Sequence, residues 1–375
     1  MSKELVKLLQ SLIRINSENP PGNETEIVLF IRNYLKSINV KYKIYEFKKN
    51  RPNLVCIIKS KNSKKRLLLT PHIDTVPATG KWKFLPFSGK IYKGKIYGRG
   101  ATDCKVNVAV CLYLIKKLIK KNNILENIDL VFAFSSDEET GSRYGIIPLL
   151  NFLKNIDYGI VLDSDDFNII IAQKGLLHLR IELFGKEAHG AYPERGINAI
   201  EYGIKILNEL INRPFKFKRH KLLNKPTLNI GRFIGGDKVN IVAGYCFFEL
   251  DIRLVPSMDK KDIIKDIVDI IKKYPVKYKI KILAYQDPIE IDKDNFLITI
   301  LKDVLKRQKI KPKITSSFGA TVLNFLIEKN ILAFSFGFGS KGQAHSKNEF
   351  VKIENLLNGA IVLEEYIKEL DKFFK

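Results

Sequence analysis

The sequence predicts an α/β protein whose mixed sheet is mostly parallel, with a second, smaller module inserted into it. Two observations support this prediction. Short apolar runs of strand length alternate with amphipathic helical patterns up to about residue 162, which is typical of sheets covered by helices. Near residue 175 the order changes, and the α/β alternation returns only after residue 286. We therefore expect a discontinuous domain at 1–175 and 287–375, and an inserted domain at 176–286.

The N-terminal part begins with helices and continues with strands that look buried. Two helical patterns lie within 3–39, and the turn-rich stretch 16–22 separates them; the second, at about 24–38, places Ile27, Ile31 and Leu35 on one stripe. Strand-like runs follow at 42–47, 53–60, 66–70, 128–134 and 158–162. Helical patterns at 105–121 and 146–154 separate the later strands, which indicates α/β architecture.

The inserted segment has the order strand, helix, strand, strand, helix, strand. We expect these elements at 176–183, 198–211, 227–234, 243–254, 260–273 and 276–284. This β-α-β-β-α-β order is the split βαβ pattern of ferredoxin-like domains. Helical patterns at 296–308 and 322–328 and a strand at 331–336 then complete the first domain.

The chain is strongly basic, because 64 Lys and Arg residues against 40 Asp and Glu residues give a formal net charge of +24. Such a charge is compatible with a nucleic-acid partner, an anionic substrate or a compositional bias. The basic residues are mostly lysines spread along the whole chain, and they rarely alternate with aromatic residues as a base-stacking surface would require. We therefore attribute the positive charge to solvated lysine-rich faces. Nucleic-acid binding is the alternative explanation, and we do not expect it.

Several features predict a soluble cytoplasmic protein. No apolar stretch approaches the roughly 18 to 20 residues that a membrane-spanning helix needs. The N-terminus lacks the unbroken apolar centre of a signal peptide. The four cysteines form no CxxC pair and lie in apolar segments, as reduced buried thiols do; they are Cys56, Cys104, Cys111 and Cys246. We therefore expect no membrane contact.

Chemically informative residues first occur in two loops of the N-terminal part. His72 and Asp74 follow the strand at 66–70, and residues two apart on an extended segment face the same side. An imidazole held by a nearby carboxylate is typical of a metal-bound histidine, although a His near an Asp is more often an ordinary hydrogen-bonded pair. Asp103 follows a glycine-rich loop at 97–102 and begins a helical pattern, where its alternative role is that of a helix cap.

Three further loops carry acidic residues or histidine. Glu138 and Glu139 belong to three consecutive carboxylates directly after the strand at 128–134, and these repel one another unless cations or protons intervene. A solvated acidic turn is the alternative. Asp163 follows the strand at 158–162, and His345 lies in the loop 342–349. Because open α/β sheets place their sites at the ends of strands, these loops predict a functional site.

Taken together and in this order, these motifs resemble the M20 family of zinc-dependent amidohydrolases and peptidases. That family includes acetylornithine deacetylase, succinyl-diaminopimelate desuccinylase, aminoacylases, carboxypeptidases, and di- and tripeptidases. The resemblance covers nearly the whole chain, since it extends to the segments at 82–87, 185–190, 235–240 and 250–253. It implies a zinc-peptidase-like catalytic domain, and a ferredoxin-like insertion that serves as lid and dimerisation domain.

The resemblance also implies a site for two Zn²⁺ ions per subunit, for which Co²⁺ can substitute. The implied metal ligands are His72, Asp103, Glu139, Asp163 and His345. Asp103 would bridge the ions, Glu139 and His345 would complete one site, and His72 and Asp163 the other. Glu138 would be the general base, and Asp74 would orient His72. The peptide bond that follows Asp103 is expected to be cis, as in the family.

In the inserted domain, the resemblance implies that His189 reaches the active site of a neighbouring subunit in a homodimer and stabilises the oxyanion. Asn240 and Arg253 would bind the substrate, since arginine suits bidentate contact with a carboxylate. We assign no role to His178 or His220.

The expected reaction is hydrolysis of an amide bond next to a free carboxylate by metal-activated water. The chain length and compact insertion favour a small N-acyl amino acid as substrate, as in the deacetylase and desuccinylase branch, and hence a role in amino-acid biosynthesis. The alternative is an aminopeptidase, dipeptidase or carboxypeptidase that acts on short peptides. Asp163 favours a peptidase, because in the family Asp at this position is more typical of aminopeptidase-like members, and Glu of carboxypeptidases, deacylases and desuccinylases. A third possibility, from another class, is a non-catalytic relative that only binds.

Overall fold

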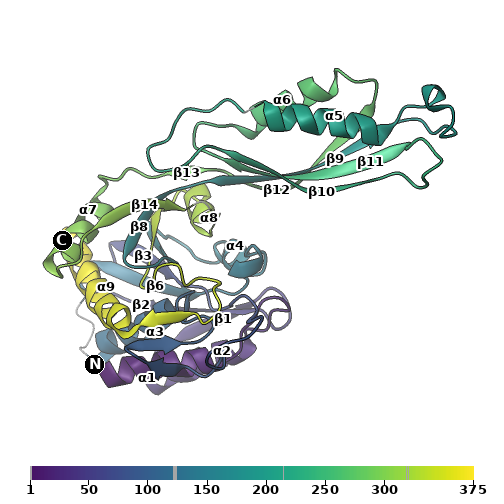
Figure 1. Ribbon diagram of the computed structural model, residues 1–375. Coiled ribbons are helices and arrows are strands. Elements are labelled where there is room, and N and C mark those ends of the chain that lie inside the picture. The colour runs from purple at the N-terminus through teal and green to yellow at the C-terminus, as the bar shows by residue number, and fades with distance from the viewer. Residues whose placement is uncertain (1, 121–124, 214, 318, 320) are drawn as a thin grey trace. The chain divides into compact units, whose positions relative to one another are not determined.

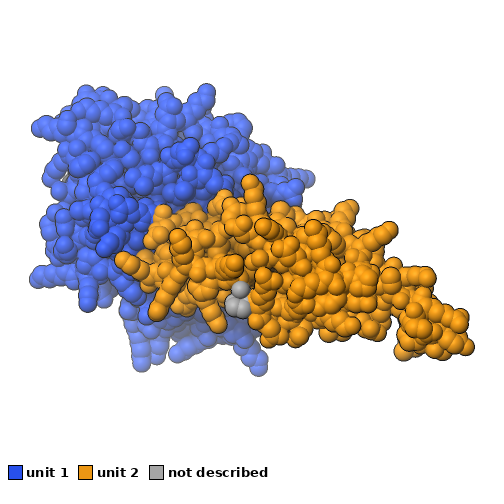
Figure 2. All heavy atoms as spheres, turned by 90° about the horizontal axis from the view of Figure 1, so that it is seen from above, with its two compact units in different colours: residues 1–171, 291–315, 321–375 blue, residues 172–290, 316–320 orange. Residues whose placement is uncertain are grey.

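The computed structural model describes residues 2–120, 125–213, 215–317, 319 and 321–375. These residues form two compact units (Figure 2). Unit 1 comprises Met1–Ile171, Ile291–Thr315 and Thr321–Lys375, and unit 2 comprises Ala172–Glu290 and Ser316–Ala320. The expected insertion was 176–286, so unit 2 also includes a few residues at each end and a short later segment of the chain.

The central sheet of unit 1 has the strand order β1-β2-β6-β3-β7-β15-β8, of which Figure 1 labels β1, β2, β6, β3 and β8. Its four middle strands are parallel to one another; they are β6 (Ile128–Phe134), β3 (Lys65–Thr70), β7 (Tyr158–Leu162) and β15 (Leu332–Phe336). The outer strands are antiparallel to their neighbours; they are β1 (Tyr42–Glu46), β2 (Pro52–Ile58) and β8 (Asn168–Gln173). The predicted α/β fold with a parallel centre is thus confirmed.

Burial explains why these runs form the middle of the sheet. All seven residues of β6 are buried, as are four of the five residues of β7. Strands covered on both faces need continuous apolar sequence, and parallel strands require such cover. Because β3, β6 and β7 run in the same direction, the loops that follow them lie at one edge of the sheet.

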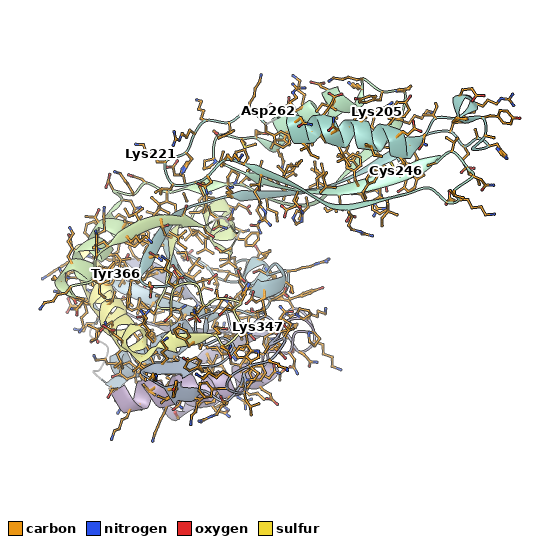
Figure 3. All side chains as sticks on the ribbon, in the orientation of Figure 1. Lys205, Lys221, Cys246, Asp262, Lys347 and Tyr366 are labelled. Atoms are coloured by element: carbon orange, nitrogen blue, oxygen red, sulfur yellow. The ribbon has the colours of Figure 1, made fainter. Side chains whose placement is uncertain are left out.

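Seven α-helices are described in unit 1; they are α1 (Ser2–Arg14), α2 (Thr25–Ser37), α3 (Lys105–Lys120), α4 (Ile146–Leu149), α7 (Phe296–Arg307), α8 (Leu323–Glu328) and α9 (Ile353–Phe373). Helix α3 is the central helix, since eleven of its 16 residues are buried; Lys121, which we expected at its end, lies outside the described residues. Helix α9, unpredicted, buries Tyr366, whose hydroxyl donates to the carbonyl of Leu297 at 3.0 Å (Figure 3).

Shorter elements complete unit 1. A three-stranded sheet has the order β16-β5-β4, formed by β16 (Phe350–Lys352), β5 (Lys95–Tyr97) and β4 (Lys90–Tyr92). A single 3-10 turn, η1 (Glu138–Thr140), follows β6. Two further short strands pair with β8: β13 (Ile289–Glu290), whose residues belong to unit 2, and β14 (Lys313–Ser317), which begins in unit 1 and ends in unit 2. Among the described helices of both units, none is long and apolar enough to cross a membrane.

Unit 2 is a four-stranded antiparallel sheet with the order β10-β11-β9-β12. Its elements follow in the order β9 (Gly175–Phe184), α5 (Ala199–Asn212), β10 (Thr227–Gly235), β11 (Tyr245–Leu254), α6 (Lys260–Ile271) and β12 (Lys277–Gln286), with a 3-10 turn η2 (Pro193–Arg195) after β9. Asn198 and Asp259 accept hydrogen bonds at the first turns of α5 and α6. This is the β-α-β-β-α-β arrangement of a split βαβ module.

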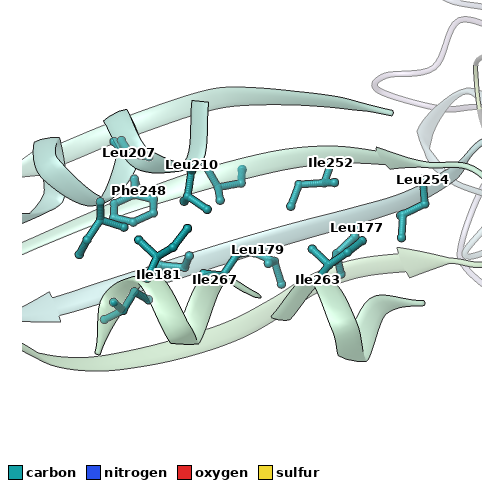
Figure 4. Close-up of a cluster of buried hydrophobic side chains, with 14 of the residues drawn as sticks. Leu177, Leu179, Ile181, Leu207, Leu210, Phe248, Ile252, Leu254, Ile263 and Ile267 are labelled. Atoms are coloured by element: carbon teal, nitrogen blue, oxygen red, sulfur yellow. The ribbon is translucent and has the colours of Figure 1, made fainter. Parts of the chain in front are cut away.

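The core of unit 2 lies between its sheet and its two helices (Figure 4). On β9, Leu177, Leu179 and Ile181 alternate with residues of the other face, and all three are fully buried. Phe248 from β11 and Ile267 from α6 pack in the same cluster. The opposite sides of the helices carry charged residues such as Lys205 and Asp262, which Figure 3 labels.

Candidate metal centre

Five segments of unit 1 bring the predicted metal ligands together. His72 follows β3, Glu139 lies in η1 after β6, and Asp163 follows β7. Asp103 precedes α3, and His345 lies in the loop between β15 and β16, which Lys347 marks in Figure 3. Residues up to 273 positions apart in sequence thus meet at the ends of the parallel strands, where open α/β sheets carry their sites.

Asp103 lies between the two histidines. Its Oδ1 is 2.9 Å from Nε2 of His72, and its Oδ2 is 3.1 Å from Nε2 of His345. The same Nε2 of His345 is 3.0 Å from Oε2 of Glu139. Each oxygen of the Asp103 carboxylate therefore faces a different histidine, as a ligand shared between two ions would.

Two groups of three side chains have their donor atoms within 4.8 Å of one another. One group is His72, Asp103 and Glu139, and the other is His72, Glu138 and Asp163. The predicted general base, Glu138, thus lies among the predicted ligands. All five predicted ligands are found in one site together with this glutamate.

The residues of this site fit metal ions. Oε1 of Glu139 is buried and makes no hydrogen bond to any described residue, although its sister oxygen contacts His345. Two donor atoms bound to the same tetrahedral zinc at about 2.0–2.2 Å lie roughly 3.3 Å apart, which is close to the 2.9–3.1 Å found around Asp103. Imidazole nitrogens and carboxylate oxygens are also donors that zinc accepts.

The electrostatics of the site favour cations. Burial, together with the nearby Asp163 and Glu139, raises the pKa of Glu138 well above its usual range. Burial and then Asp103 raise the pKa of Asp163 to about 7. Hydrogen bonds to Asp103 and Glu139 raise the pKa of His345 to about 10. A buried group of carboxylates holds protons in this way when positive charge is insufficient, and divalent ions supply that charge.

Asp74 contacts His72 and also the segment that carries the two glutamates. Nδ1 of His72 is 3.0 Å from the backbone carbonyl oxygen of Asp74 and 3.6 Å from its carboxylate oxygen Oδ1. We expected the carboxylate to orient the ring, whereas the backbone oxygen is the nearer acceptor. The carboxylate instead accepts hydrogen bonds from the backbone N–H groups of Glu138 and Glu139, both at 3.1 Å.

The loop that carries Asp103 folds around Glu349, a residue for which the motifs predict no role. The Glu349 side chain is fully buried and accepts hydrogen bonds from the backbone N–H groups of Gly100, Thr102 and Asp103 at 2.8–3.0 Å. It also accepts one from Arg99 at 2.9 Å. The predicted cis peptide bond between Asp103 and Cys104 is confirmed.

The three predicted residues of unit 2 lie at two different places on it. Next to His189, the N–H of Gly190 donates to the carbonyl of Asn240 at 2.8 Å, so His189 and Asn240 lie on adjoining segments. Arg253 lies near the far end of β11, where it pairs with Asp251 at 2.8 Å. Within unit 2, Arg253 is therefore not brought beside the other two.

The two histidines without an assigned role have acidic neighbours in unit 2. Nε2 of His178 is 3.5 Å from Asp251, and Nε2 of His220 is 3.1 Å from Glu290.

Comparisons of the sequence identify its relatives. Residues 68–369 match the model of Peptidase family M20/M25/M40. An uncharacterized metallohydrolase of Methanocaldococcus jannaschii is 32% identical, over 98% of this chain and 99% of that protein. A succinyl-diaminopimelate desuccinylase of Buchnera aphidicola is 30% identical, over 80% of this chain and 82% of its own length.

Solved structures share the fold. A tripeptidase from Staphylococcus aureus has a TM-score of 0.81 at 23% identity, covering 99% of both chains. An M20 family metallo-carboxypeptidase from Sulfolobus solfataricus has a TM-score of 0.76 at 22% identity, covering 97% of this chain and 98% of its own. The sequence match, this fold and the cluster of histidines and carboxylates agree, and the chain therefore belongs to the M20 peptidase family, as a metal-dependent hydrolase of amide bonds.

Proposed function

We propose that this protein hydrolyses the amide bond of a small N-acyl amino acid and uses two zinc ions per subunit, which Co²⁺ can replace. The observation that carries the proposal is the Asp103 carboxylate, whose two oxygens face His72 and His345 separately. His72 and Asp163 would hold one ion, and His345 and Glu139 the other, with Asp103 shared between them.

The chemistry follows from these positions. Zinc bound by these residues would lower the pKa of water and polarise an amide carbonyl. Glu138 lies within 4.8 Å of the donor atoms of His72 and Asp163, where its carboxylate takes a proton from water and delivers it to the leaving amine. Asp74 keeps Glu138 in place through the backbone hydrogen bond at 3.1 Å.

Unit 2 would bind the substrate. Arg253 has the planar fork that suits a substrate carboxylate, and Asn240 would add a polar contact. Because His189 is exposed at a different end of unit 2 from Arg253, we propose that His189 and Asn240 act on the site of a partner subunit in a homodimer. His189 would then donate to the developing oxyanion.

The choice of substrate rests on two opposing observations. The similarity to a succinyl-diaminopimelate desuccinylase over 80% of the chain favours an acylated amino acid, and with it a role in amino-acid biosynthesis. Asp163 at the ligand position, and solved relatives described as a tripeptidase and a carboxypeptidase, favour short peptides. Peptide hydrolysis is therefore the second candidate function.

We also propose a reducing, cytoplasmic location. All four cysteines are buried and free, which supports this proposal.

A hydrolysis panel tests the proposal. The zinc- or cobalt-reconstituted protein is offered N-acetylornithine, N-succinyl-diaminopimelate, other N-acyl amino acids, and di- and tripeptides, each with and without a chelator. We expect chelator-sensitive release of the amino acid from one acylated substrate. Cleavage of free-amine peptides alone would favour the second candidate. No hydrolysis of any substrate by a fully metal-loaded protein would contradict both and revive a non-catalytic relative.

A further inference from the structure

A buried arginine lies next to the segment that carries the two glutamates. Arg51 precedes β2, and its side chain is 4% exposed. It donates to both oxygens of Glu24, at 2.7 and 2.8 Å, and to Oδ1 of Asp137 at 2.8 Å. Asp137 directly precedes Glu138 and Glu139. We propose that Arg51, held by Glu24, is a positioning residue that sets Glu138 and Glu139 through Asp137; this rests on the roles proposed for these glutamates.

Asp137 organises the turn that presents the glutamates. Its backbone adopts the left-handed conformation, with φ of 67°, which is costly for a residue other than glycine unless its surroundings hold it. Its carboxylate supplies that hold, because Oδ1 accepts from the Thr140 hydroxyl at 2.5 Å and Oδ2 from the backbone N–H of Tyr144 at 2.8 Å. The backbone N–H of Ser142 donates to its carbonyl at 2.6 Å. The segment 137–144 thus folds around this one carboxylate.

Asn19 connects this turn to the second carboxylate that holds the glutamates. Its Nδ2 lies 2.8 Å from Oδ2 of Asp74 and 3.0 Å from the Thr140 hydroxyl. Asp74 in turn accepts the backbone N–H groups of Glu138 and Glu139. Asp74 therefore fixes the backbone of the two glutamates, and Asp137 fixes the turn that begins directly before them. Asn19 connects these two parts, because it contacts both Asp74 and Thr140.

The charge of Arg51 is needed for this arrangement. Asp137 is 1% exposed, and a buried carboxylate that loses its paired cation is costly unless it moves toward water. A displaced Asp137 no longer accepts hydrogen bonds from Thr140 and Tyr144, so the turn opens. Because Glu138 is the next residue, its carboxylate moves with the turn.

An arginine suits this position better than a lysine. Its Nε and Nη2 bind the two oxygens of Glu24 while Nη2 also reaches Asp137, and only the planar guanidinium fork offers donors in this arrangement. The absence of a side chain at Gly22 provides space for the guanidinium of Arg51, since a Cβ atom at this position would collide with it. The turn-rich stretch 16–22 and the following Glu24 thus serve the same cluster.

The test compares Arg51→Lys and Arg51→Met with wild type. A matched control is Arg66→Met, which removes another arginine of unit 1 that pairs with a buried aspartate, Asp129 at 3.3 Å, at the start of β3. The readouts are thermal melting of the metal-free protein, equilibrium binding of Co²⁺, the visible absorption spectrum of the cobalt-loaded protein, and kcat and KM. The cobalt spectrum, and the comparison of the change in kcat with the change in KM, distinguish a positioning role of Arg51 from a mere loss of stability.

We expect both Arg51 variants to bind Co²⁺ about 10- to 100-fold more weakly and to show an altered cobalt spectrum, as changes behind metal ligands do. We expect kcat to fall by a similar factor with KM changed less than about 3-fold, because Arg51 does not touch substrate. Arg66→Met is expected to keep the wild-type spectrum and affinity. Folded Arg51 variants with wild-type spectrum and affinity would overturn the proposal.

The role of Arg51 can still be tested if its variants do not fold, or if the wild-type protein hydrolyses none of the substrates. If neither Arg51 variant folds, Glu24→Gln takes their place, since it keeps the size and one acceptor oxygen; a wild-type cobalt spectrum in Glu24→Gln would then overturn the proposal. If wild type binds Co²⁺ but hydrolyses nothing, the proposed function fails, and the cobalt spectrum and affinity still decide the role of Arg51.

Discussion

Glu349 is the buried acceptor around which the loop before Asp103 folds. Its carboxylate receives the backbone N–H groups of Gly100, Thr102 and Asp103 and the guanidinium of Arg99, all between 2.8 and 3.0 Å. Replacing Glu349 with alanine removes every one of these contacts. The loop is thereby predicted to lose both stability and its hold on Asp103.

The size of the loss follows from what stays behind. Arg99 is 3% exposed, and leaving a buried charge without its partner costs about 3–5 kcal/mol. Each buried donor left without an acceptor costs about 1–3 kcal/mol. Arg99 retains weaker contacts to the carbonyls of Ser346 and Pro77 at 3.3 Å, and water can enter the space. We therefore expect Glu349→Ala to lower the free energy of unfolding of unit 1 by about 4 kcal/mol.

The assay uses the only tryptophan of the chain, Trp82, whose ring centroid is 5.1 Å from the Arg99 guanidinium. Urea unfolding followed by tryptophan fluorescence at pH 8 therefore reports on unit 1 and on this loop. Glu126→Gln is the control, since that side chain is 49% exposed and 3.4 Å from Lys61, and we expect a change below about 1 kcal/mol. A loss below about 1 kcal/mol in Glu349→Ala, equal to the control, would refute the reasoning.

Four further predictions concern the site and unit 2. Glu138→Gln is expected to keep its metal content and to lower kcat at least about 100-fold; unchanged kcat would exclude Glu138 as general base. Because Asp163 has a pKa of about 7 and His345 one of about 10 in the metal-free protein, metal ions must displace their protons at pH 7. The apparent Co²⁺ affinity therefore rises with pH, more steeply below pH 7 than above it, and a pH-independent isotherm would contradict this. Phe248→Ala is expected to destabilise unit 2 by about 3–5 kcal/mol in circular-dichroism unfolding, with metal content unchanged, whereas a loss below about 1 kcal/mol would argue against its fully buried position. Light scattering is expected to show a dimer, and a monomer that retains full activity would exclude a role of His189 across an interface.

The metal centre could be predicted because its signals are local. Each of His72, Glu139 and Asp163 follows an apolar run that forms a buried strand of the parallel sheet. Parallel strands carry their following loops to one edge, so sequence position relative to the strand already indicates spatial proximity. The same reasoning predicted the middle of the sheet and the order of elements in unit 2.

The residues that hold this centre could not be predicted. Arg51 and Asp137 are 86 positions apart, and nothing in the sequence around Arg51 separates it from the many solvated basic residues. Glu349 was visible in the loop 342–349, but its four donors come from another loop, about 250 positions earlier. The acceptor for His72 is a backbone oxygen, and no sequence pattern reports on it. Such contacts depend on how loops close, not on periodicity.

Helix α9 was missed for a different reason, since its signal was present. Leu356, Ala360, Leu363, Ile367 and Leu370 recur at helical spacing and are buried. Strand β8 is harder to predict from the sequence, because its apolar run is short and is followed almost directly by the next strand, which begins at Gly175.

The central claim is that this site holds two metal ions that share Asp103. Titration of the metal-free protein with Co²⁺, with bound metal measured per chain, tests it most directly. The structure predicts two equivalents for wild type and about one tightly bound equivalent for His345→Ala, because that variant loses a donor of one ion only. A wild-type chain that binds only one equivalent or less would contradict the claim.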